Sequence, residues 1–145
     1  MTYVNAKLIA ENRGVTIAES RVSTTEDFNN SVKIEISSKN QTFEMEGALF
    51  GKNDPRIVSI NTYPVDMSPK GNMLMIENND SPGMIGTIGL LLGQNNINIS
   101  TMNVSLSKIH QPALMLLTVD CPVQDDVLSQ IKNQNGILKA WALKI

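Results

Sequence analysis

Residue types that carry common enzymatic and binding chemistry are scarce in this sequence. It contains one cysteine, Cys121, and one histidine, His110, among 145 residues. A single cysteine excludes an internal disulfide, and one thiol with one imidazole cannot complete a thiolate zinc site. The scarcity of cysteine is typical of a reducing compartment. We therefore expect a cytoplasmic protein without a metal centre.

Charge of one sign and long apolar stretches are also missing. Lysine and arginine total 12 against 14 acids, which gives a net charge of −2 and no basic surface for a phosphate backbone. No apolar run approaches the roughly 20 residues of a membrane helix, and the first residues lack the pattern of a signal peptide. We expect neither nucleic acid nor membrane as a partner. Hydrophobic residues still make up 41% of the chain, enough for a folded core.

Two prolines and a glycine interrupt the middle of the chain, where residues 63–72 read YPVDMSPKGN. This composition predicts a connection, with a boundary near residues 68–71. The chain then divides into domains over 1–70 and 71–145. Domains of this size bury only about 60% of their unfolded surface, so we expect additional burial against a partner.

The hydrophobic pattern of the second half predicts a β-α-β-β-α-β order. The third strand is apolar on both faces and is therefore expected to be central. This order is that of the ferredoxin-like fold, an α+β architecture with two helices on one face of an antiparallel sheet. The expected strands cover 73–78, 102–106, 113–119 and 137–145, and the expected helices cover 82–94 and a segment from Asp125 to about Lys132.

The first of these helices has a marked start and an unusual face. Ser81 as N-cap and Pro82 at the first helical position predict where it begins. Three glycines share one stripe of this helix, although each costs roughly 1 kcal/mol relative to alanine. We infer that something approaches the helix backbone closely at Gly86, Gly89 and Gly93.

The first half is less regular and reads as a small α+β domain. A short helical pattern over 3–12 ends at Gly14, and an alternating strand covers 32–36. A turn leads into a strand over 42–50, and a tight loop over 51–56 leads to a strand over 57–60. These strands predict a small antiparallel sheet.

The most informative stretch for binding runs NNDSPGMIG over residues 78–86. An aspartate just before a helix start places a carboxylate beside free backbone N–H groups and the positive end of the helix dipole. An amino acid is a zwitterion with matching needs: its carboxylate suits the amides of residues 83–85, and its ammonium group suits Asp80. The predicted contacts are Asn78, Asp80, Gly83, Met84, Ile85 and Asn98, the two asparagines serving a small polar side chain. An equally plausible interpretation makes Asp80 and Asn98 turn residues that cap the two helix ends.

Other polar residues favour simpler interpretations. Lys52 and Arg56 flank a tight turn and suit a phosphorylated ligand, but a solvated turn is the better interpretation. His110 reads as an exposed loop residue and Cys121 as a half-buried strand end. The methionines read as core residues at 73, 75, 84, 102 and 115.

The run ENNDSPGMIGTIGLLLGQNNINISTMNVS, followed by ALMLLTVDCPVQDDVLSQI, resembles the ACT domain at the C-terminus of the D-3-phosphoglycerate dehydrogenase family. The first half, from VNAKLIAENRG through GALFGKNDPRIVSINTYPVDMSPKGN, resembles the intervening, allosteric-substrate-binding domain of the longer form of that enzyme. The resemblance covers nearly the whole chain.

This resemblance implies a regulatory tail with L-serine as feedback effector at an interface between ACT domains, and hence a homo-oligomer. It implies effector contacts at Asn78, Asp80 and Asn98. The NAD cofactor would belong to a catalytic part, because this chain has no GxGxxG turn and no Arg, Glu and His catalytic set. The family often has a basic residue where this chain reads Ser105 and Ser107, with Lys108 later.

Two other functions fit the pattern. The small subunit of an iron-sulfur L-serine dehydratase pairs the same domain types, although the segment 5–14 favours the dehydrogenase. A purely structural dimerisation domain would bind no amino acid.

Overall fold

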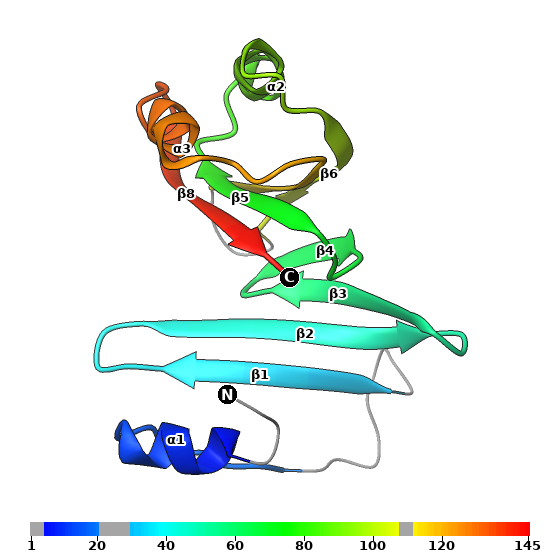
Figure 1. Ribbon diagram of the computed structural model, residues 1–145, viewed down its shortest axis with the longest axis vertical. Coiled ribbons are helices and arrows are strands. Elements are labelled where there is room, and N and C mark those ends of the chain that lie inside the picture. Colours follow the sequence, from blue (N-terminus) through cyan, green and yellow to red (C-terminus); the bar gives the residue numbers. More distant parts are fainter. Residues whose placement is uncertain (1–4, 21–29, 108–111) are drawn as a thin grey trace.

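The computed structural model describes residues 5–20, 30–107 and 112–145. The strands in these ranges form two four-stranded antiparallel sheets, ordered β1-β2-β3-β4 and β6-β7-β5-β8 (Figure 1). The expected α+β class is confirmed. The elements are α1 (Ala6–Asn12), β1 (Ser31–Ser37), β2 (Thr42–Phe50), β3 (Asp54–Ile60), β4 (Tyr63–Met67), β5 (Asn72–Asn78), α2 (Met84–Gln94), β6 (Ile99–Leu106), β7 (Ala113–Val119), α3 (Asp125–Lys132) and β8 (Ile137–Lys144).

The second sheet has the ferredoxin-like arrangement that the sequence predicted. Strands β7 and β5 are central, and α2 and α3 lie together over one face (Figure 1). The core beneath the helices joins inward residues of the central strands to the apolar faces of both helices. Its fully buried members include Leu74, Ile76, Ile88, Leu92, Leu117 and Ile131.

The opposite face of this sheet is covered by the first half of the chain. A second buried cluster joins β3 and β4 to the central strands of the other sheet. This covering explains why β7 is apolar on both sides: Met115 and Leu117 face the helices, whereas Leu114 and Leu116 face β3 and β4. The shared cluster is Ile57, Ile60, Tyr63, Val65, Met67, Met73, Leu114 and Leu116.

Strand β4 lies where the sequence predicted a connection, and that part of the prediction is wrong. Tyr63, Val65 and Met67 are buried, while Pro64 and Asp66 between them are exposed. β4 is the edge strand of its sheet, where a proline without an N–H is tolerated. The expected break over 68–71 falls just after this strand, between β4 and β5.

The start of α2 also differs from the prediction. The helix begins at Met84, and its N-cap is Gly83 in a left-handed conformation with φ 88°, not Ser81. The Ser81 hydroxyl instead donates to Asn79 Oδ1 at 2.9 Å, and the Ser81 carbonyl accepts from the Met84 amide at 3.2 Å. A tight turn over 81–84 thus precedes the helix, because the serine side chain bonds backwards along the chain.

The apolar alternation of β1 predicted the strand correctly, but not its burial. Val32, Ile34 and Ile36 are 68%, 47% and 62% exposed. The strand pairs through its whole length with β2 on one side and is the edge strand of its sheet. No described helix is long and apolar enough to span a membrane.

Gly136 precedes β8 with φ 88°, and a Cβ there would lie 2.6 Å from both Asn79 Oδ1 and Met84 Cε. We predict that Gly136→Ala lowers the free energy of unfolding through both backbone strain and this overlap. The matched control is Gly51→Ala, where φ is +59° and no atom lies within 4 Å, so only strain is added. Strain alone costs about 1–2 kcal/mol, and overlap adds about 1–3 kcal/mol. Chemical denaturation measures both; equal losses would show that the overlap relaxes freely.

Candidate functional site

The turn after β5 is held by a buried amide side chain. Asn78 is fully buried; its Oδ1 accepts the Asp80 amide at 2.9 Å, and its Nδ2 donates to the Ala113 carbonyl at 3.4 Å. Asp80 lies in the left-handed region with φ 54°. Asparagine at 78 therefore positions the turn, and the exposed Asp80 side chain is displayed at the surface.

The beginning of α2 offers backbone donors close to that carboxylate in sequence. The amides of Gly83 and Ile85 donate to no group in the described part of the chain, whereas the Met84 amide is used by the Ser81 carbonyl. Free amides at a helix N-terminus attract anions. Of the three amides over 83–85 that were predicted to bind an anion, two have no hydrogen-bond acceptor among the described residues.

Asn98 lies at the other end of the domain from Asp80. The register places Asn78 opposite Ala113, and Ile99 opposite Val119, at the two ends of β7. The 11 residues of α2 also separate the two side chains along the helix, which corresponds to about 16 Å. One small ligand cannot contact Asp80 and Asn98 of the same chain.

The helix-capping interpretation of Asp80 and Asn98 finds no support in the hydrogen bonds. No side chain caps the start of α2, and its end is capped by Asn95, whose Nδ2 donates to the Leu91 carbonyl at 2.9 Å. The backbone of Asn98 exchanges bonds with Asp120: its amide donates to Oδ1 at 2.9 Å, and its carbonyl accepts the Asp120 amide at 3.1 Å. The Asn98 side chain is exposed at the edge of this turn.

The glycine stripe of α2 is open. A Cβ placed on Gly86, Gly89 or Gly93 would meet no atom within 4 Å. Ile85 and Leu90 on the same helix are 52% and 65% exposed. The close approach that these glycines predicted is therefore not made by any described residue of this chain.

The anion site suggested at Lys52 and Arg56 is already partly neutralised. Arg56 Nε lies 3.1 Å from Asp54 Oδ1, and Arg56 Nη1 lies 2.9 Å from Asp66 Oδ1. Both carboxylates raise the pKa of the guanidinium, and Asp54 has the larger effect. This arrangement favours the solvated-turn interpretation. His110 and Lys108 lie outside the described residues.

The remaining candidates from the sequence, Cys121 and the methionines, lie in or against the protein core. Cys121 is partly buried next to the helix core, and burial, with Asp120 beside it, raises the pKa of its thiol. No group of three or more histidine, cysteine, aspartate or glutamate side chains suited to a metal ion occurs among the described residues. The methionines at 73, 84 and 115 are buried, and those at 75 and 102 pack against the core.

Ser105 and Ser107 form hydrogen bonds between the two halves of the chain. In the sequence they stood out only as differences from the family pattern. The Ser105 hydroxyl on β6 donates to the Pro64 carbonyl on β4. Ser107 Oγ lies 2.8 Å from Thr62 Oγ1, in the turn before β4. No local sequence signal pairs residues more than 40 positions apart, so this contact was not predictable.

Comparison with known proteins agrees with the fold. Residues 1–61 match the family model described as the D-3-phosphoglycerate dehydrogenase intervening domain. Over its whole length the chain is 39% identical to a D-3-phosphoglycerate dehydrogenase from Archaeoglobus fulgidus, of which it covers 28%. It is likewise 32% identical to one from Synechocystis, of which it covers 26%. A relative of the same name from Bacillus subtilis is 31% identical over 93% of this chain and 26% of its own length. The chain thus spans about a quarter of these curated relatives.

The ferredoxin-like unit, together with the added antiparallel sheet, defines a protein of the α+β class. The match to the intervening domain and the similarity over the whole chain indicate which protein family this chain resembles. The chain is homologous to the C-terminal regulatory region of the D-3-phosphoglycerate dehydrogenase family.

Asn78→Leu removes the acceptor of the Asp80 amide while keeping the side chain's approximate volume. We predict a loss of about 1–3 kcal/mol in the free energy of unfolding, since the part-buried Asp80 amide and the buried Ala113 carbonyl both lose their partner. Amide exchange at Asp80 should accelerate at the same time. Asn133→Leu, at an exposed position, is the control and should change stability by less than about 0.5 kcal/mol. An unchanged exchange rate at Asp80 would contradict the positioning role.

Proposed function

We propose that this chain is the effector-binding and oligomerising regulatory part of a cytoplasmic D-3-phosphoglycerate dehydrogenase, with L-serine as its feedback effector. The observation that carries the proposal is the turn over 78–85, which presents a carboxylate and free helix amides together. The Asp80 carboxylate suits the ammonium group of an amino acid, and the Gly83 and Ile85 amides suit its carboxylate.

The position of Asn98 makes a second copy part of this proposal. A site that uses both Asp80 and Asn98 needs Asn98 from another chain, because the two lie at opposite ends of the domain. In a two-fold symmetric pair in which Asp80 of each copy faces Asn98 of the other, two identical sites form. The hydroxyl of serine would then meet the Asn98 amide.

The open face of α2 supports the same assembly. Glycines without neighbours allow two backbones to approach closely, and the exposed Ile85 and Leu90 supply apolar surface beside them. Burial of this face in a dimer also supplies the additional burial that a small domain needs. The proposed interface and the proposed effector site thus share one helix.

Catalysis and NAD binding are proposed to belong to the remainder of the enzyme. The chain lacks a nucleotide-binding GxGxxG turn, and its second sheet is antiparallel rather than the parallel sheet of a dinucleotide fold. The regulatory part would act by changing how the catalytic parts are held when serine joins two copies.

L-serine is predicted to stabilise the chain, and more strongly than L-alanine or L-valine. At one hundred times its dissociation constant it should add about 2.7 kcal/mol, a rise in Tm of roughly 5–10 °C. Asp80→Asn and Asn98→Ala should each abolish most of this rise while the proteins stay folded. The first removes one partner of a charged hydrogen bond, which costs about 2–5 kcal/mol, and the second removes the amide that meets the serine hydroxyl. No shift in the parent chain would leave only a structural dimerisation role.

Mixing the two variants tests whether the site is shared. A dimer of one Asp80→Asn chain and one Asn98→Ala chain contains one intact site and one doubly changed site. We predict that calorimetry detects serine binding to the mixture, refolded together, at up to one site per mixed dimer, although neither variant binds alone. A site confined to one chain would give no recovery on mixing.

A further inference from the structure

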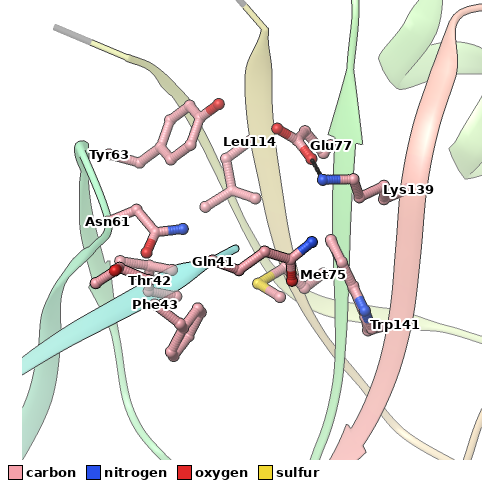
Figure 2. A pocket seen from close by; sticks show the side chains of 11 residues that line it. Gln41, Thr42, Phe43, Asn61, Tyr63, Met75, Glu77, Leu114, Lys139 and Trp141 are labelled. Atoms are coloured by element: carbon pink, nitrogen blue, oxygen red, sulfur yellow. Dashed lines mark ion pairs between the residues drawn. The ribbon is translucent and has the colours of Figure 1, made fainter. Parts of the chain in front are cut away.

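A cavity of about 370 Å³ lies between the two sheets. Its floor is the face of the second sheet that the helices do not cover, and its roof is the start of β2 together with the turn between β3 and β4. The volume lies at the small end of the range for metabolite pockets, about 300–1,000 Å³. Figure 2 shows the side chains that surround it.

Two opposite charges stand next to each other at this cavity. Glu77 on β5 and Lys139 on β8 are cross-strand neighbours, and Lys139 Nζ lies 3.4 Å from Glu77 Oε2 (Figure 2). This separation is longer than the roughly 2.7–2.9 Å of a charge-assisted hydrogen bond. The Glu77 side chain is only 21% exposed, whereas that of Lys139 is 61% exposed. The pair is therefore open enough for a ligand to take over both partners.

The walls beside the charges are apolar and partly aromatic. Met75 and Trp141 are cross-strand neighbours on the floor, and Phe43 lies across from them on the roof. Trp141 is 38% exposed, although it is the largest side chain type in the protein. An aromatic ring or long aliphatic group would bury this surface and contact the Met75 thioether.

The roof is fixed in place by one asparagine. Asn61, with φ 50°, donates its amide to the Glu44 carbonyl at 2.8 Å and accepts the Glu44 amide on Oδ1 at 2.9 Å. Both bonds tie the β3–β4 turn to β2. Burial, with Glu77 nearby, raises the pKa of the Tyr63 phenol at the edge of this roof.

We propose that this cavity is a second binding site, for a free α-amino acid with a large apolar side chain. The ligand's ammonium group pairs with Glu77, its carboxylate pairs with Lys139, and its side chain lies between Phe43 and Trp141. The small hydroxymethyl group of serine would leave these walls uncovered. The site is thus distinct in place and in specificity from the one proposed at Asp80, and it does not depend on it.

Trp141 allows a direct test, because it is the only tryptophan in the chain. Titration of the full 145-residue chain with L-phenylalanine, with selective excitation of tryptophan, should give a saturable change in emission. Phenylpropionate lacks the ammonium group and phenylethylamine lacks the carboxylate. Each should bind at least about tenfold more weakly, which corresponds to losing one charged contact. Equal binding of all three compounds would overturn the zwitterion assignment.

Substitutions locate the ligand. Glu77→Gln and Lys139→Met should each weaken binding of L-phenylalanine by about tenfold or more. Lys144→Met, on the same strand but outside the cavity, is the matched control and should bind as the parent does. Circular dichroism checks that each variant is folded.

Two results would overturn the proposal. One is unchanged binding by both Glu77→Gln and Lys139→Met. The other is the absence of saturable binding by L-phenylalanine, L-methionine and L-leucine in both fluorescence and calorimetry.

Discussion

Burial of both faces of β7 is the constraint on which the rest of the structure depends. A strand with no polar face requires a cover on each side, and the helices α2 and α3 supply only one. The β3–β4 hairpin supplies the other through Tyr63, Val65 and Met67. The first half of the chain is thereby fixed against the second. Its position in turn creates the cavity between the sheets, because the roof follows from where the hairpin packs.

The parts that were predictable from sequence are those set by local periodicity. The order of the second half, the central place of β7 and the bounds of α3 follow from spacing of apolar residues and from charges near helix ends. The start of α2 was misplaced because two local motifs compete at Ser81, and the bond to Asn79 prevails over the helix cap. Strand β4 was missed because Pro64 within it and Pro69 after it suggested a connection, although the alternation of Tyr63, Val65 and Met67 was already visible.

The candidate site was proposed from residues that are close in the sequence, and its geometry was not predictable. Asp80 and the helix start lie together because they are neighbours in sequence. That Asn98 lies at the opposite end of the sheet follows only from the register of β6 on β7, which a sequence pattern does not reveal. The Glu77 and Lys139 pair was missed for the same reason, since 62 residues separate two side chains that the pairing of β5 with β8 makes neighbours.

The mixed cluster of β3, β4, β5 and β7 has a consequence for how such a region is inherited. Met73, Leu114 and Leu116 belong to one half of the chain and are covered by residues of the other. A gene that lost residues 1–70 would encode a ferredoxin-like unit with an exposed apolar sheet face, which favours aggregation. Recombination that separates the halves at residues 68–71 would therefore expose this apolar face, even though no helix or strand crosses that junction. We expect the two halves to be inherited together as one unit.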